Sequence, residues 1–374
     1  MTPLNDIPDQ DIAIRILVNS FNRNRLASTY LFYGPDGVGK WSAALALASL
    51  VNCLSPIKDE SGKVVDACGE CLHCRQVKNG TFPELHFAVP IPPHKSESEA
   101  VGLTLEFIEQ KKGEPYRIIS SARQLTIPVA TARAIKRSVA IKPAKDLKRF
   151  ILFYQMERML PASADSLLKL IEEPPPETII ILTARTPESL LPTIQSRAQK
   201  ISFRSIPEDL IAEYITAKYK IPEEKARFAA RLAEGSAGRA LEYLEEKDDA
   251  SLRQISFLIF KALFLKDSAA LLSAINEMVN PRDRGEAEQI LAQWQSYLAD
   301  LICLKFGGES AAVINADLVS ELESISVHIP SEATFSRLKE SIRDSQKSLR
   351  RNVHIKPAMM ALALDLKDYI NQSA

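Results

Sequence analysis

Two groups of residues near the start of the chain have the types and the spacing of known chemical sites. The first is the stretch Gly34-x4-Gly39-Lys40, which follows a short apolar run and precedes a segment rich in Ala and Leu. Glycines at this spacing let backbone N–H groups turn towards phosphate oxygens, and the lysine adds a positive charge. Gly34, Gly37, Gly39 and Lys40 are therefore the candidate nucleotide-binding residues. The alternative is a chance glycine turn, which the strand-loop-helix context argues against.

The residue after the lysine is the wrong type for a metal-dependent nucleotidase. Active phosphate loops place Ser or Thr there to hold Mg²⁺, whereas this chain has Trp41, whose indole N–H can only donate a hydrogen bond. Ser42 lies one step further along the predicted helix, and this step turns its side chain by about 100°. We therefore expect no Mg²⁺ at the loop. The sequence leaves open whether ATP or ADP binds without the metal or whether Trp41 fills the pocket.

The second group is a set of four cysteines, Cys53, Cys68, Cys71 and Cys74, spaced x14, x2 and x2. Four thiolates can close a tetrahedral shell around Zn²⁺, and a closed shell without an open position is typical of structural zinc. A redox pair and four unligated buried thiols are the alternatives. The intervening His73 could compete as a ligand, but its place between two cysteines predicts that it points to solvent.

Composition limits the classes of function that remain. The chain has 374 residues, and its 47 Lys and Arg residues balance 47 Asp and Glu residues, so its net charge is zero. No global positive field draws it to nucleic acid, and any DNA contact must be local or shared with partners. We see neither a signal peptide nor an apolar run long enough to span a membrane. The protein is expected to be cytoplasmic, where thiols stay reduced unless a metal holds them.

Apolar runs alternate with helical stretches through the first two hundred residues. This alternation predicts a parallel α/β sheet with the phosphate loop at its carboxyl edge. The segment after the second strand, Gln155-Met156-Glu157, lacks the Asp-Glu pair that orients Mg²⁺ and water in phosphate-loop ATPases. The predicted strands are 30–33, 149–154, 179–182 and 200–203, and the predicted helices are 9–24, 101–112, 130–139 and 163–171.

After Pro207 the sequence becomes helical and remains so to the end. Its later part predicts a separate α-helical domain. The predicted helices before residue 250 are 208–219, 223–233 and one that opens after Gly235, and those beyond it are 251–265, 283–305, 333–347 and 356–371.

Five motifs together resemble those of one family, the clamp-loader subunits of bacterial DNA polymerase III, and within it the delta-prime branch. The resemblance spans roughly residues 8–245 and is weaker beyond. The motifs are Gly34-x4-Gly39-Lys40, the four cysteines, Leu167-Leu168-Lys169-Leu170-Ile171-Glu172-Glu173-Pro174-Pro175, Leu191-Pro192-Thr193-Ile194-Gln195-Ser196-Arg197 and Gly235-Ser236-Ala237-Gly238.

The resemblance implies an AAA+ domain, a small helical lid and a C-terminal collar through which five subunits join in a ring. It also implies the partners of this chain, namely gamma/tau and delta subunits, the sliding clamp, and primed DNA through the complex. The implied parts are an AAA+ domain at 1–206 with a zinc module at 53–74 and an insertion at 90–127, a lid at 207–248 and a collar at 249–374.

Three departures from the family pattern imply a subunit that does not hydrolyse ATP. Active members carry Thr after the loop lysine, Asp-Glu after the second strand, and an arginine where this chain has Gly238. Arg239 lies one position further and faces about 100° away. The Ser-Arg pair survives, although the family's usual cysteine after it is Ala198 here.

Arg197 is the candidate catalytic residue, as an arginine finger that reaches ATP bound by a neighbouring subunit. The alternative is a structural arginine that pairs with a nearby carboxylate. Two other classes of function also remain open at this point. One is a working ATPase of the same fold, such as the gamma/tau motor subunit, and the other is a free-standing, zinc-stabilised nucleic-acid-binding protein.

Overall fold

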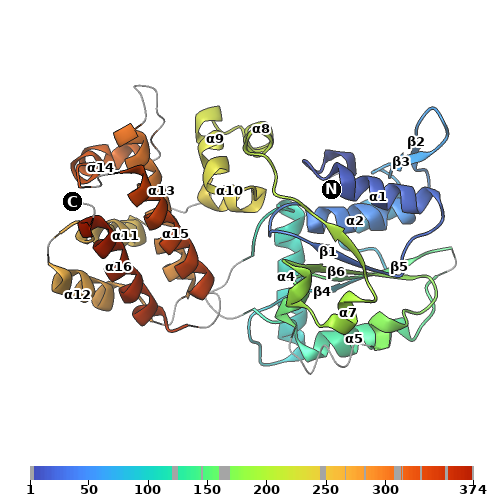
Figure 1. The fold of residues 1–374 in the computed structure, drawn as a ribbon. Helices are drawn as coiled ribbons and strands as arrows, with labels where there is room; N and C mark the ends of the chain where they lie inside the picture. The colour runs from blue at the N-terminus through green and yellow to red at the C-terminus, as the bar shows by residue number, and fades with distance from the viewer. Residues whose placement is uncertain are drawn as a thin grey trace. The chain divides into compact units, whose positions relative to one another are not determined.

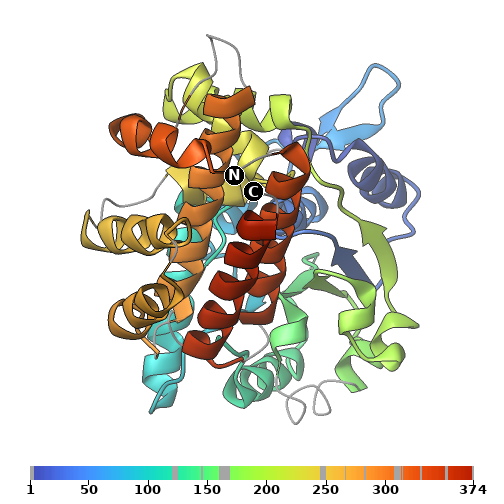
Figure 2. The same ribbon diagram turned by 60° about the vertical axis from the view of Figure 1, so that its left-hand side comes forward.

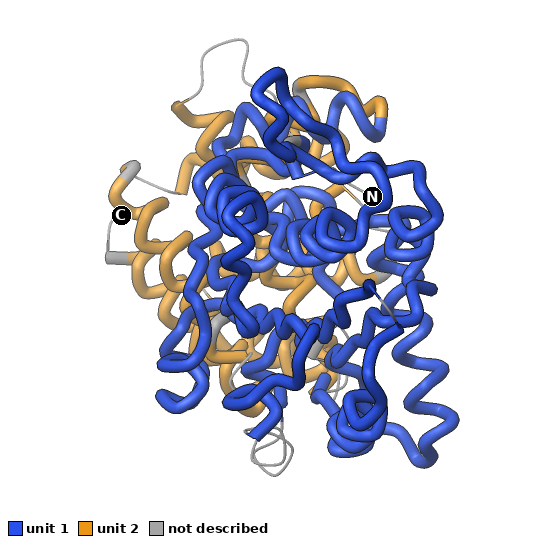
Figure 3. The backbone as a smooth tube through the Cα atoms, turned by 90° about the vertical axis from the view of Figure 1, so that its right-hand side faces the viewer, with its two compact units in different colours: residues 1–119, 124–219, 233–242 blue, residues 120–123, 220–232, 243–374 orange. Residues whose placement is uncertain are grey.

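The computed structural model divides into two compact units (Figure 3). The first comprises residues 1–119, 124–219 and 233–242, and the second comprises residues 120–123, 220–232 and 243–374. The predicted domain boundaries at 206 and 248 stay predictions. The structure describes residues 4–119, 125–144, 146–159, 169–244, 250–265, 267–281, 284–306, 313, 315–328, 331–349 and 353–372.

The first unit is built on a five-stranded sheet in which every paired strand is parallel (Figure 1). β1 (Thr29–Tyr33) lies inside the sheet, and its Leu31 pairs with Leu182 on one side and Lys200 on the other. The strand order is β4-β5-β6-β1-β7. The other four strands are β4 (Leu85–Ala88), β5 (Arg149–Phe153), β6 (Thr178–Ala184) and β7 (Gln199–Ser202).

Continuous apolar runs explain the central strands. All residues of β5 and β6 are buried, as expected of a parallel sheet covered by helices on both faces. Ile151 and Ile180 from the sheet share a core cluster with Ile135 from a flanking helix. The helices of this part are α1 (Asp11–Asn22), α2 (Lys40–Val51), α3 (Leu72–Lys78), α4 (Glu97–Gly113), α5 (Val129–Val139), α7 (Pro192–Gln195), α8 (Glu208–Tyr219) and α10 (Ala237–Leu244).

The four predicted strands are confirmed, but β4 and a hairpin of β2 (Ile57–Lys58) and β3 (Val64–Asp66) were not predicted. The predicted insertion, residues 90–127, carries α4, and its two ends meet in a bridge between Ile91 and Thr126. Most of the predicted helix 163–171 falls on residues 160–168, which lie outside the described residues, and residues 169–172 are helical.

The second unit contains the C-terminal helices. Trp294 and Tyr297 are fully buried in its core, where the indole N–H of Trp294 donates to the carbonyl of Ser256 at 3.1 Å. Figure 2 shows α15 and α16, in red, packed side by side. The described helices of this unit are α9 (Glu223–Leu232), α11 (Ala250–Ala262), α12 (Ser268–Met278), α13 (Arg284–Phe306), α14 (Val319–Ser326), α15 (Glu332–Leu349) and α16 (Ile355–Gln372).

These elements confirm the predicted parallel α/β sheet with the glycine loop at its carboxyl edge, and the predicted all-helical C-terminal part. Across the described helices, none combines the length and the apolar character needed to cross a membrane.

Candidate nucleotide loop, arginine and metal centre

The glycine loop connects the carboxyl end of β1 with the first turn of α2, and its backbone conformation requires glycine. Gly34 has a φ of 145° and Gly37 a φ of 73°, both in the range that side chains disfavour. A Cβ on Gly34 would lie 2.1 Å from the carbonyl oxygen of Phe203, and a Cβ on Gly37 would lie 2.5 Å from the hydroxyl of Ser236. The loop is therefore held tightly between β7 and the start of α10.

Lys40 opens α2, and its side chain turns back onto its own loop. The Nζ atom donates to the carbonyl oxygens of Gly34 and, at 2.7 Å, Pro35, and it lies 3.8 Å from a carboxylate oxygen of Asp36. Burial lowers the pKa of Lys40, while the charge of Asp36 opposes this shift. The three donors of the ammonium group are thus directed at the loop itself, where an active loop directs them at phosphate.

Two acids share the surroundings of Lys40. Asp36 accepts a 2.6 Å hydrogen bond from Nε of Arg185. Burial alone would raise the pKa of Asp36, but the charges of Arg185 and Lys40 hold it well below its ordinary value. Burial, and then the charge of Asp36, raise the pKa of Glu157. Its Oε2 atom has no hydrogen-bond partner among the described residues.

Glu157 lies at the site, although its position after the second strand did not make it a predicted site residue. No Asp-Glu pair stands there, yet Glu157 lies close enough to Lys40 to interact with its charge. The sequence contained one indication of this role, because Glu157 lies only four positions after the carboxyl end of a central strand. Position alone did not show whether the 3₁₀ turn Met156–Arg158 would direct this acid into the site.

Trp41 is buried in an aromatic cluster. Its ring stacks on Phe87 with centroids 5.4 Å apart, and it meets Phe107 and Tyr154 edge-on at 6.0 and 5.5 Å. Such contacts add to the stabilisation from burial itself. The position that holds a Mg²⁺ ligand in active loops is therefore occupied by a core side chain.

The first turn of α10 packs directly on the loop. Ser236 donates its hydroxyl to the carbonyl oxygen of Asp36 at 2.6 Å, and the N–H of Gly238 donates to the carbonyl oxygen of Gly37 at 3.2 Å. A Cβ at Gly238 would lie 2.2 Å from the carbonyl oxygen of Tyr116, so no larger residue fits there. Arg239 instead pairs with Glu234 at 3.3 Å.

Arg197 follows α7 and is half exposed. Its guanidinium lies 3.4 Å from a carboxylate oxygen of Glu172 and donates to the carbonyl oxygen of Thr193 at 3.1 Å. This is the contact expected of a structural arginine. The ion pair is solvent-accessible on both sides, and such pairs are worth about 0–1 kcal/mol. The guanidinium is therefore free to exchange this partner for another anion at little cost.

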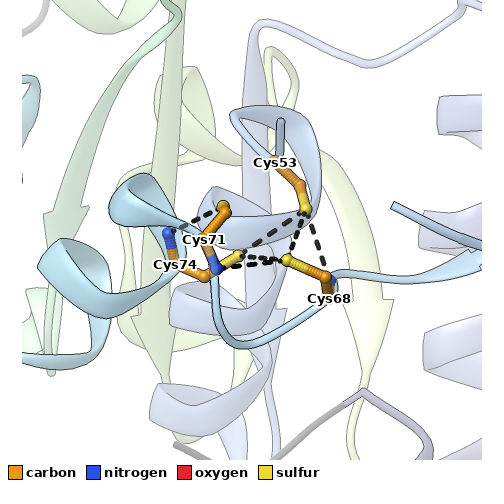
Figure 4. A group of neighbouring side chains, drawn as sticks. All are labelled: Cys53, Cys68, Cys71 and Cys74. Atoms are coloured by element: carbon orange, nitrogen blue, oxygen red, sulfur yellow. Dashed lines mark hydrogen bonds between the residues drawn. The ribbon is translucent and has the colours of Figure 1, made fainter. Parts of the chain in front are cut away.

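The four cysteines converge on one point (Figure 4). Cys53 lies just beyond α2, Cys68 follows β3, and Cys71 and Cys74 belong to the cap and first turn of α3. Their four sulfur atoms all lie within 4.8 Å of one another. The group comes from three separate elements, so it fastens the β2-β3 hairpin and α3 to the end of α2.

The geometry of the group suits a tetrahedral ion. Zn–S distances of about 2.3 Å separate the sulfurs of a tetrahedral site by about 3.8 Å. Here the separations are 3.5 Å for Cys53 and Cys68, 3.7 Å for Cys53 and Cys74, and 4.0 Å for Cys68 and Cys74. A hydrogen bond from Ser55, followed by backbone N–H groups, lowers the pKa of Cys68 to about 6. At Cys68 this shift favours the thiolate, whereas burial raises the pKa of Cys53 and of Cys74.

The prediction that His73 points to solvent is wrong. Its Nδ1 atom lies 2.8 Å from the carbonyl oxygen of Asn52, and its ring packs against Phe82 with centroids 5.5 Å apart. Helix α3 turns this side chain towards the end of α2, where Asn52 also bonds both backbone groups of Lys148. His73 thus supports the module and stands outside the thiol group.

Comparison with known proteins gives a consistent set of relatives. The family described as "DNA polymerase III, delta subunit" matches residues 9–207. DNA polymerase III subunit delta' of Bacillus subtilis is 24% identical over 361 residues, which cover 96% of each chain. Subunit delta' of Escherichia coli is 24% identical over 84% of this chain and 80% of its own. Subunit tau of Escherichia coli is 26% identical over 80% of this chain but only 42% of its own length.

Proposed function

The chain belongs to the DNA polymerase III delta-prime family of clamp-loader subunits, and on that premise we propose that it is the subunit that does not hydrolyse ATP itself. The observation that carries this proposal is the state of the loop. Trp41 is a core side chain at the metal-ligand position, and Lys40 is bound by the carbonyl oxygens of its own loop. Without Mg²⁺ and a free lysine, the developing charge of phosphoryl transfer has no stabilisation.

We also propose that the chain assembles with gamma/tau and delta subunits in a five-membered ring that loads the sliding clamp on primed DNA. Its relatives include delta' and tau subunits of DNA polymerase III, which supports these partners. In this assembly residues 1–206 form the AAA+ domain, residues 207–248 the lid and residues 249–374 the collar. The described helices α11 to α16 share one apolar core, which supports a separate helical domain for the collar.

Arg197 is proposed as the arginine finger for the neighbouring subunit. Its partial exposure and weak ion pair with Glu172 support this role, because a finger must leave its resting contact to reach a γ-phosphate. In trans, a finger stabilises the charge that develops during transfer. The chain would thus contribute to catalysis in a site that it does not itself contain.

The four-cysteine group is proposed to bind one structural zinc ion. Cys53, Cys68, Cys71 and Cys74 supply four thiols within 4.8 Å of one another, and the separations among Cys53, Cys68 and Cys74 are close to those of a tetrahedral site. Four protein ligands leave no open position for water or substrate, so the ion would stabilise the fold and take no part in a reaction.

Turnover by the purified chain tests the central proposal. We expect no Mg²⁺-dependent ATP hydrolysis above that of a Lys40→Ala variant, since neither protein can position metal. The same preparation should enter a complex with gamma/tau and delta subunits during gel filtration. Hydrolysis that survives repurification and disappears in Lys40→Ala would instead identify a working ATPase.

A further inference from the structure

The sequence of the insertion at 90–127 indicates no function for it, yet its helix α4 lies against the start of α2. Phe107 packs edge-on against Trp41 and lies 5.6 Å from the ring of Tyr154. Phe107 is buried, whereas Val101 and Leu105 on the same helix are exposed. One face of α4 therefore covers the aromatic cluster beneath the loop, and the other face is open to solvent.

Lys111, one turn further along α4, is only 2% exposed. Its Nζ atom lies 4.7 Å from the centre of the Tyr154 ring, in the geometry of a cation-π contact. The same atom donates to the carbonyl oxygens of Pro115 at 3.2 Å and Arg117 at 2.5 Å. Lys111 thereby fixes the turn that follows the helix over the aromatic cluster.

That turn carries Tyr116, which is fully buried. A Cβ added to Gly39 would lie 3.3 Å from the Tyr116 ring, and one added to Gly238 would lie 2.2 Å from its carbonyl oxygen. The ring also meets Tyr214 of α8 at 5.1 Å. Tyr116 thus lies between the phosphate loop and the first turn of α10, in contact with both.

We propose that residues 107–118 are a built-in occupant of the nucleotide site, which closes the loop, joins it to α10 and excludes ATP and ADP from this chain. A nucleotide would have to displace a fully buried tyrosine and a lysine with three satisfied contacts before it reached the loop. The inference goes beyond the proposed function, which concerns hydrolysis and leaves binding open.

The occupant is part of the same chain, so joining the loop to α10 needs no free ligand. A bound ligand stabilises a protein only according to its concentration and affinity. The stabilisation by an internal segment does not depend on any ligand concentration, because the entropy of ordering the segment is lost when the chain folds. We therefore expect the contact between the loop and α10 to be the same at any concentration of ATP or ADP.

Hydrogen exchange of the purified chain tests the contact directly. In the wild type, the amides of Arg117 and Gly238, which donate to Glu114 and Gly37, should both be protected. Tyr116→Ala should speed their exchange by about tenfold or more, equivalent to about 1.4 kcal/mol. Tyr116→Phe keeps the ring, and Leu105→Ala changes only an exposed position of α4, so both should exchange like the wild type. Equal exchange at Gly238 in Tyr116→Ala and wild type would overturn the inference.

Calorimetric titration with ADP, with and without Mg²⁺, gives a second readout that does not depend on any variant folding. The wild type should show no saturable binding up to about 1 mM ADP. Saturable binding below that concentration overturns the inference even if no ATP is turned over, and it leaves the proposed function intact. ATP turnover by the purified chain is a different result, because it contradicts the proposed function itself.

Discussion

At the scale of single residues, the surroundings of Lys40 decide what its charge can do. The residue type and spacing match a phosphate-binding lysine, but its ammonium group is already bound by loop carbonyls and by the nearby charge of Asp36. Trp41 beside it is held by three aromatic rings. A single substitution at either position would leave the other obstacle in place, so Trp41→Thr alone is not expected to create an ATPase.

Lys111 gives a prediction about the pH dependence of stability. Burial lowers its pKa from 10.5 to about 7, Lys40 adds to the shift, and the acids Asp36, Glu114 and Glu242 oppose it. Between about pH 7 and pH 10 the unfolded chain therefore binds more protons at this position than the folded chain does. Its contribution makes the free energy of unfolding rise with pH in this window, by at most about 1.4 kcal/mol per pH unit.

The measurement is urea unfolding at several pH values across this window, for wild type and Lys111→Met. Methionine fills a similar volume and has no proton to lose, so its free energy of unfolding should rise less steeply with pH. Lys112→Met is the matched control, because its side chain is exposed and pairs with Glu109. If all three proteins give the same slope, Lys111 stays fully charged in the folded state.

The sequence was most informative where spacing alone defines a site. Cys53 and Cys74 could be placed in one group because only a few ligand spacings satisfy a tetrahedral ion, and their thiols do lie in one cluster. The burial of Glu157 and the direction of His73 could not be predicted, since each depends on how a turn or a helix directs one side chain. Tyr116 was missed for a related reason, because its role comes from its contact with Gly238, which is distant in sequence.

At the scale of elements, the proposed zinc ion would take the place of a hydrophobic core in the cysteine module. The β2-β3 hairpin consists of strands of only two and three residues, too short to be stable by themselves. It is fastened on one side by Asn22 of α1, whose side chain bonds both backbone groups of Val64. On the other side the four thiols connect it to α2 and α3.

Loss of one thiol should therefore release the module. In Cys71→Ser we expect zinc to fall from about one ion per chain to a small fraction, and the free energy of unfolding to fall by more than about 3 kcal/mol. Elemental analysis of protein purified without chelator, together with denaturant unfolding, measures both. Cys303→Ser is the control, because Cys303 belongs to α13 and not to the thiol group. A wild type free of zinc would refute the assignment.

Element prediction succeeded where the hydrophobic pattern was long and uniform. The buried strands β5 and β6 and the long helices α13, α15 and α16 all follow such patterns. The edge strand β4 has only four residues, including a histidine, and the short helices α12 and α14 lie between longer ones. For elements of this length the local signal is weak, and partner strands or helices decide whether they form.

At the scale of the whole molecule, zero net charge limits how the chain meets DNA. A protein that binds DNA alone relies on many Lys and Arg contacts to phosphates. This chain offers no general excess of positive charge, so we expect it to meet primed DNA as one member of an assembly. Its catalytic contribution, if Arg197 is a finger, likewise exists only in the assembly.

The complex therefore provides the test of Arg197. Arg197→Ala should leave the chain folded and assembled, because its ion pair with Glu172 is exposed and such pairs contribute about 0–1 kcal/mol. A finger is worth on the order of 10³-fold or more in rate at the site it serves. The other sites would keep their own fingers, so bulk DNA- and clamp-stimulated turnover should fall only in part. Clamp loading, which needs coordinated sites, should fall further.

Glu172→Gln separates a finger from a structural arginine. If Arg197 acts only through its ion pair, removing the charge of Glu172 should reduce turnover as much as Arg197→Ala does. If Arg197 acts on ATP in the neighbouring subunit, Glu172→Gln should stay near the wild-type rate, since it only frees the guanidinium. Lys200→Ala, a change at a nearby exposed cation that donates to Gln195, controls for a general loss of positive charge. Equal loss in Arg197→Ala and Glu172→Gln complexes of confirmed assembly would assign Arg197 a structural role alone.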